Sequence, residues 1–139
     1  MKIVTIFLLI LLITKTVFSR NTGETEITAE EGIEVFQDEK YYLLNKNVKI
    51  ESDNFVLFGD KIKIFFENDL YDIKKIVADG NVKLDSSNYN IMAKGEKLSI
   101  TLETEEILVL GNESELKTDE ILMFSNELIK INNLEGMFF

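Results

Sequence analysis

The chain has 139 residues, of which 45% are hydrophobic, so its composition is that of a single folded domain with a modest core. Acidic residues outnumber basic residues 25 to 15, and the formal charge of −10 argues against a nucleic-acid partner. Histidine and cysteine are absent, which excludes Cys- and His-based nucleophilic sites, the usual zinc sites and disulfides. The composition therefore indicates no metal and no cofactor.

The N-terminal segment has the pattern of a secretory signal. A basic residue precedes an apolar run at 3–13, which is too short to span a bilayer as a helix. A plausible signal-peptidase site follows Ser19, because the residues at its −3 and −1 positions are of the types that the peptidase accepts. We expect a cleaved signal at 1–19 and one mature domain at 20–139. A helix that continued through Lys15 would instead retain the segment as a membrane anchor, and the sequence leaves that alternative open.

The rest of the chain alternates between apolar and polar residues with a period of two, which is typical of half-buried β-strands. Clusters of Asn, Asp, Ser, Glu and Gly separate the alternating runs. The predicted strands of this all-β fold span 33–37, 41–51, 54–66, 72–85, 88–102, 106–117, 119–131 and 134–138, with a possible short opening strand at 25–29. Segment 119–131 also fits an amphipathic helix, but its place in a repeat favours a strand.

The repeat consists of two phrases. The first places a Gly-Asn or Lys-Asn pair before an alternating exit, in LLNKNVKIES, VADGNVKLDS and LVLGNESELK. We interpret Gly80–Asn81 in the second copy as a kink or β-bulge, because glycine tolerates unusual backbone angles. The other phrase has a small residue before alternating apolar residues, with copies at Gly59, Ala93 and, more weakly, Ser125. Because the two phrases recur in the same order along the chain, they predict stacked β-units that bury their apolar faces against each other.

The ordered series of phrases after a signal segment resembles the LptA (OstA-like) family of periplasmic lipopolysaccharide-transport proteins. The resemblance covers about 26–131, and the residues that carry it are Ile27–Ala29, Asn47–Ile50, Gly59–Ile64, Gly80–Leu84 and Ala93–Leu98. It implies an open, twisted β-jelly roll built from repeated two-strand units, in which two facing sheets form a trough. Glu113 stands where the first phrase otherwise has valine, which weakens the expected trough towards its C-terminal end.

The resemblance implies a periplasmic carrier or bridge protein rather than an enzyme. It would shield the acyl chains of lipopolysaccharide, or of its lipid A part, between the inner and outer membranes. The candidate lipid-binding residues lie on the inner apolar face of the predicted strands, and they are Val48, Ile50, Phe58, Ile62, Ile64, Phe66, Ile76, Val82, Leu84, Leu98, Ile100 and Leu102. For any one of these residues the pattern alone favours a closed core, since every β-sandwich has such a face, and the lipid-binding interpretation depends on the resemblance.

The resemblance also implies partners, namely the OstA-like domains of inner- and outer-membrane transport components. Edge strands, which we expect in 27–37 and 119–138, would also allow a head-to-tail homo-oligomer. Two alternatives stay open at this point. A retained N-terminal anchor would make the chain an LptC-like inner-membrane component, and a dry interior would make it a structural β-repeat scaffold without a ligand.

Overall fold

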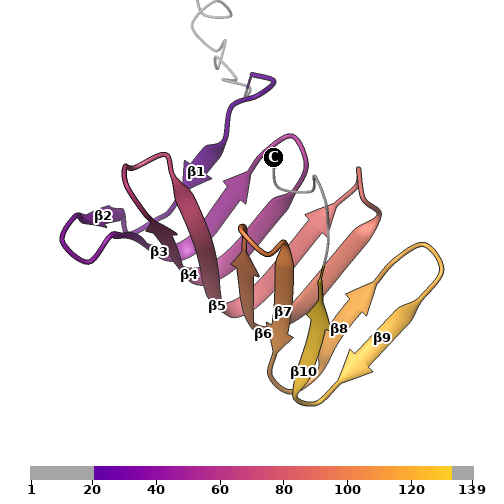
Figure 1. The fold of residues 1–139 in the computed structure, drawn as a ribbon. Helices are drawn as coiled ribbons and strands as arrows, with labels where there is room; N and C mark the ends of the chain where they lie inside the picture. Colours follow the sequence, from indigo (N-terminus) through magenta and orange to yellow (C-terminus); the bar gives the residue numbers. More distant parts are fainter. Residues whose placement is uncertain (1–20, 133–139) are drawn as a thin grey trace, which may run out of the picture.

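The structure is a computed structural model, and it describes residues 21–132. These residues form one antiparallel sheet of ten strands (Figure 1). The strands are β1 (Glu26–Thr28), β2 (Ile33–Phe36), β3 (Tyr41–Glu51), β4 (Val56–Phe66), β5 (Ile73–Ser86), β6 (Ile91–Thr101), β7 (Glu106–Leu110), β8 (Ser114–Lys117), β9 (Leu122–Ser125) and β10 (Leu128–Ile131). In this part of the chain no helix is long and apolar enough to cross a membrane.

The all-β prediction is confirmed, and the strands expected between residues 25 and 102 match β1 to β6. Two expected strands are each divided in the structure. Segment 106–117 forms β7 and β8, and segment 119–131 forms β9 and β10 rather than a helix. The expected signal at 1–19 and the expected strand at 134–138 lie outside the described residues.

Of the four long strands, β3 and β6 change one neighbour halfway along their length, whereas β4 and β5 keep the same neighbours throughout. One half of β3 pairs with β1 and the other half with β2, and the two halves of β6 pair with β8 and β7. The single sheet therefore folds into two layers that share one core. Layer A contains β1, β8, β9 and residues 48–51, 56–59, 82–86 and 91–95 of the long strands. Layer B contains β2, β7, β10 and residues 41–45, 61–66, 73–79 and 97–101.

β-Bulges in β3 and β5 mark the corner between the layers. Lys46 and Asn47 have φ values of 64° and 45°, and Gly80 and Asn81 have φ values of 79° and 46°. The strand register shifts at both pairs, so the predicted bulge at Gly80–Asn81 is confirmed. A Cβ on Gly80 would lie 2.5 Å from Oδ2 of Asp60. Asn81 Nδ2 donates to the same Oδ2 at 2.9 Å, which ties the corner of β5 to that of β4.

The corners of β4 and β6 are built differently, because two consecutive residues point outward there. In β4 these are Asp60–Lys61, so inward positions are odd-numbered up to Gly59 and even-numbered after it. In β6 the outward pair is Glu96–Lys97, which follows Gly95. The structural counterpart of Gly59 is therefore Gly95, and the sequence-based pairing of Gly59 with Ala93 was wrong. Ala93 is instead an ordinary core residue of layer A.

Candidate functional site

The candidate site is the apolar interior between the two layers. Most of the predicted inner-face residues are buried there, namely Val48, Ile50, Ile62, Ile64, Phe66, Ile76, Val82, Leu84, Leu98 and Ile100. Leu102 is half-buried and packs against the same core. Their inward placement is thus observed, whereas their contact with a lipid stays a prediction.

Phe58 was placed on the wrong face by the sequence pattern. Its side chain is 38% exposed, while Leu57 beside it is fully buried. Phe58 pairs with Lys49 and Lys83, which places it on the outer face of layer A. The error arose because alternation was counted backwards from Ile62. The two consecutive outward residues at the β4 corner shift the inward positions by one residue, so the count fails before the corner.

The sequence reasoning also missed about half of the core. The missed buried hydrophobic residues are Leu44, Phe55, Leu57, Ala78, Ile91, Ala93, Ile107, Val109, Leu116 and Ile129. Some of them carried a usable signal, since Ile107 and Val109 alternate with half-buried neighbours in EILVL. Leu57 could have been found only with knowledge of the phase change in β4.

Cross-strand pairing joins the inward residues into two apolar rows that face each other. The layer A row runs across seven strands through Ile27, Ile50, Leu57, Leu84, Ala93, Leu116 and Met123. The layer B row runs across seven strands through Val35, Tyr42, Ile64, Ile76, Ile100, Ile107 and Ile131. With neighbouring strands about 4.8 Å apart, each row is roughly 29 Å long.

These rows reach both ends of the described sheet. They continue past the weak third copy of the repeat, where Glu113 is exposed with a φ of 58° and lies in the turn that separates β7 from β8. Ser114 and Leu116 follow it and point into the core. The apolar interior therefore extends to β9 and β10 despite the expected weakness at Glu113.

A small cavity opens between the layers at their free ends, away from the corner. It has a volume of about 80 Å³. Its apolar walls include Ile27 and Ile50 of layer A and Ile64 and Ile76 of layer B, together with Phe55 and Leu102, which directly adjoin β4 and β6. That volume is about the share of three water molecules in the liquid, so an acyl chain requires the two layers to separate.

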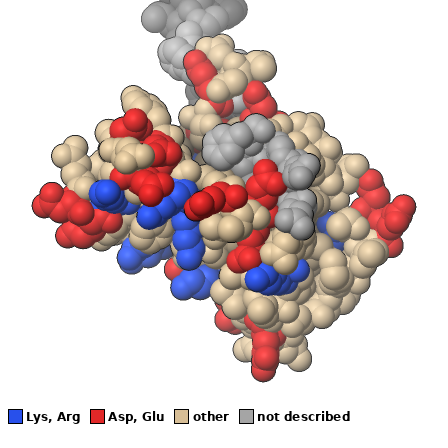
Figure 2. Space-filling view, in the orientation of Figure 1, with Lys and Arg blue, Asp and Glu red and all other residues tan. Residues whose placement is uncertain are grey.

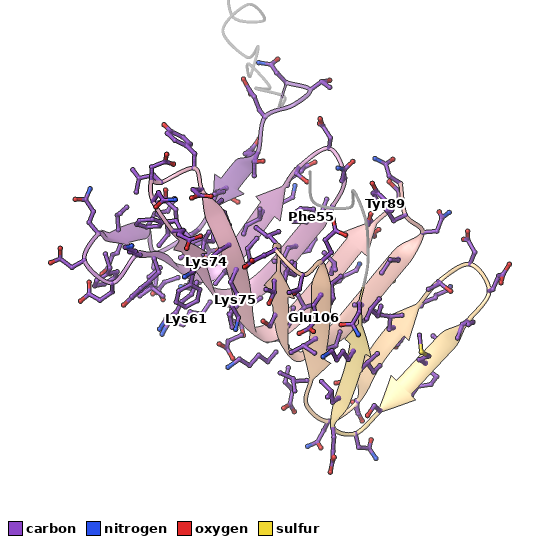
Figure 3. All side chains as sticks on the ribbon, viewed as in Figure 1. Phe55, Lys61, Lys74, Lys75, Tyr89 and Glu106 are labelled. Atoms are coloured by element: carbon purple, nitrogen blue, oxygen red, sulfur yellow. The ribbon has the colours of Figure 1, made fainter. Side chains whose placement is uncertain are left out.

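A hydrogen-bonded turn fixes Phe55 at the edge of this cavity (Figure 3). The backbone NH of Ser52 donates to the carbonyl of Phe55 at 2.9 Å, and the backbone NH of Phe55 donates to Ser52 Oγ at 3.2 Å. Ser86 Oγ donates to the carbonyl of Asn54 at 2.5 Å and joins the turn to β5. The cavity wall on the layer A side is therefore well supported.

Tyr42 is the polar member of the layer B row. Its hydroxyl donates to the carbonyl of Leu70 at 2.5 Å, and its ring packs at 5.4 Å from that of Phe66. Burial raises the pKa of Tyr42, with smaller contributions from Tyr71 and Asp69. The hydroxyl therefore stays protonated at neutral pH and can keep this donor role.

Among residues 21–132, no group of acidic, histidine or cysteine side chains could hold a metal ion. The interior instead presents hydrocarbon surface bounded by the edge strands. On β2, Ile33 and Val35 point to the inner side opposite Leu44 and Tyr42, yet they are 51% and 47% exposed.

Comparisons with known proteins agree with this architecture. The family model described as LptA/(LptD N-terminal domain) LPS transport protein matches residues 26–132. Among solved structures, the chain is similar to LptH of Pseudomonas aeruginosa, described as the LptA homologous periplasmic component of the conserved lipopolysaccharide transport device. That similarity has a TM-score of 0.67 and 10% sequence identity, and it covers 79% of this chain and 80% of LptH. Comparison with the curated proteins gave no match.

Proposed function

This chain belongs to the family of LptA and LptD N-terminal-domain lipopolysaccharide transport proteins, and from that premise we propose that it is a periplasmic carrier of lipopolysaccharide acyl chains. The observation that carries the proposal is the pair of inward rows, apolar except for the hydroxyl of Tyr42, which cross the sheet from one edge to the other. In this role the segment before Arg20 serves as a cleaved export signal.

The energetic reason for such a carrier is the exposure of acyl chains to water. Each methylene contributes about 0.8 kcal/mol, so a chain of about twelve carbons carries roughly 10 kcal/mol of exposure cost. Lipid transfer without shielding would be slow at that cost. We propose that acyl chains enter at the free ends of the layers, part them, and slide along the two rows without any covalent step.

The edges of the sheet allow the apolar rows to continue from one molecule into the next. β1 and β2 lie at one end, and β9 and β10 lie at the other. We propose that these edges pair with OstA-like domains of inner- and outer-membrane components, or with further copies of this chain. Such head-to-tail pairing is heterologous and extends the apolar rows, with Ile33 and Val35 of β2 covered by the neighbouring molecule.

Substitution of Leu102 by aspartate is expected to weaken lipopolysaccharide binding at least tenfold. Leu102 is half-buried at the cavity, so the carboxylate would face the apolar path of the acyl chain with little damage to the core. Displacement of a fluorescent lipopolysaccharide from the purified protein measures the effect. The matched control is Leu43→Asp, because Leu43 is half-buried and pairs with Lys63, on the outer side of layer B. Equal losses in the two variants would count against an interior binding site.

A further inference from the structure

The outer face of layer B is rich in lysine, although the chain as a whole carries a formal charge of −10. The cross-strand register places the outward residues of its central strands together. They are Lys61, Lys63 and Phe65 of β4, Lys75, Val77 and Asp79 of β5, and Lys97, Ser99 and Thr101 of β6, of which Ser99 is buried. This central surface, which we call the lysine face, has four cations and one carboxylate. The flanking strands add Glu34, Glu106 and Lys130 to the outer face of layer B, and Asp60 and Glu96 point outward at the adjoining corners.

Charge on the outer face of layer A is balanced by contrast. One cross-strand row carries Lys49, Lys83, Lys94 and Glu115, and the next carries Glu26, Glu51, Asp85 and Lys117. The face as a whole therefore has four lysines and four carboxylates. Many other carboxylates lie in turns, such as Glu67, Asp69 and Asp72 between β4 and β5. Figure 2 shows lysine atoms gathered on one part of the viewed surface with acidic atoms concentrated around it. The lysine face is thus a local departure from the charge of the chain.

Most of the positive charge on the lysine face is free to meet a ligand. Lys97 lies 3.9 Å from a carboxylate oxygen of Asp79. Within residues 21–132, no ion pair involves Lys61, Lys63 or Lys75. The ammonium of Lys63 lies 4.9 Å from the centre of the Tyr41 ring, so an aromatic surface adjoins the cations. Figure 3 shows Lys61 and Lys75 projecting beyond the strands.

We propose that the lysine face docks on an anionic lipid bilayer. Lysines that stand near a negatively charged membrane surface are attracted to its headgroups, whereas carboxylates farther away are screened within about 8 Å at physiological salt. Half-buried Phe65 and Val77 lie between the lysines and suit the apolar part of the headgroup region. Docking in this way leaves the two inner apolar rows unobstructed, because they lie on the opposite side of layer B.

The test is co-flotation of the periplasmic protein with vesicles that contain phosphatidylglycerol or only phosphatidylcholine. Binding is expected only to the anionic vesicles, and it should weaken as salt is raised. The variant Lys61→Gln/Lys63→Gln/Lys75→Gln should bind about a hundredfold more weakly, because each lysine near an anionic surface contributes about a fivefold factor. The control variant Lys83→Gln/Lys94→Gln/Lys117→Gln changes the net charge equally and should stay within about threefold of the natural protein.

Three outcomes would overturn the proposal. They are equal binding to both kinds of vesicle or to neither, equal losses in the two triple variants, and preferential binding of soluble polyglutamate, which would identify an acidic protein as the partner. A second readout does not depend on the lysine variants. The chain has no cysteine, so a polarity-sensitive fluorophore can be attached at Thr101→Cys on the lysine face or at Met92→Cys on the outer face of layer A. Anionic vesicles should shift the first probe and not the second, and the reverse pattern would overturn the docking orientation.

Discussion

Replacement of Phe66 by alanine is expected to lower the free energy of unfolding by about 3–5 kcal/mol. Phe66 is 4% exposed, and its ring packs against that of Tyr42 at the end of layer B. Truncation removes a large apolar surface and leaves a cavity that the surrounding strands cannot fill completely. Urea unfolding monitored by circular dichroism measures the change.

The matched control for Phe66 is Phe58→Ala in the same strand. Both phenylalanines are predicted on the inner face from the sequence alone, but Phe58 lies on the outer face of layer A. The Phe58→Ala substitution should lower the free energy of unfolding by about 1 kcal/mol or less, mainly because contacts with the aliphatic parts of neighbouring lysine side chains are lost. Similar costs for the two substitutions would contradict the phase change that the structure shows in β4.

Deletion of Asn81 is expected to abolish cooperative folding. This residue is part of the bulge that adds one position to β5 relative to β6. Without it, every residue from Val82 onward in β5 would move to the opposite face, and Val82 and Leu84 would each lose about 1.5–3 kcal/mol of burial. Circular dichroism and gel filtration should report an unfolded or aggregated chain rather than a stable domain.

Deletion of Ser87 provides the comparison, because it removes one residue from the exposed turn between β5 and β6. Turns accept changes in length more easily than strands, so this variant should still unfold cooperatively. If the two deletions had the same effect, the bulge would have no special role in setting which residues face the core.

The fold was largely predictable where alternation was long and regular. The strands around the first two copies of the repeat, β3 to β6, were expected almost to their observed ends. The C-terminal strands were not, because Gly111 and Glu113 adopt positive φ values and break a run whose residues still alternate in type. Alternation reports which residues share a face, but it does not report where the hydrogen-bonded partner changes.

The candidate site was predictable only in part, for a related reason. Residues after each corner, such as Ile62 and Leu98, were correctly placed on the inner face. Residues before the corners of β4 and β6 were either missed, as with Leu57, or reversed, as with Phe58. The phase change depends on two consecutive outward residues, and Asp60–Lys61 has no composition that distinguishes it from an ordinary polar stretch. The cross-strand rows could not be predicted, because identifying them requires the register of the whole sheet.

The account rests on the claim that acyl chains travel between the layers, and site-specific photocrosslinking in cells that synthesise lipopolysaccharide tests it most directly. A photoreactive amino acid at Ile73 would face the cavity, and one at Val56 would lie on the outer face of layer A, both at half-buried positions. We predict that lipopolysaccharide becomes crosslinked at Ile73 and not at Val56. Crosslinking at Val56 alone, or no crosslinking at Ile73 in a folded and exported protein, would contradict transport through the interior.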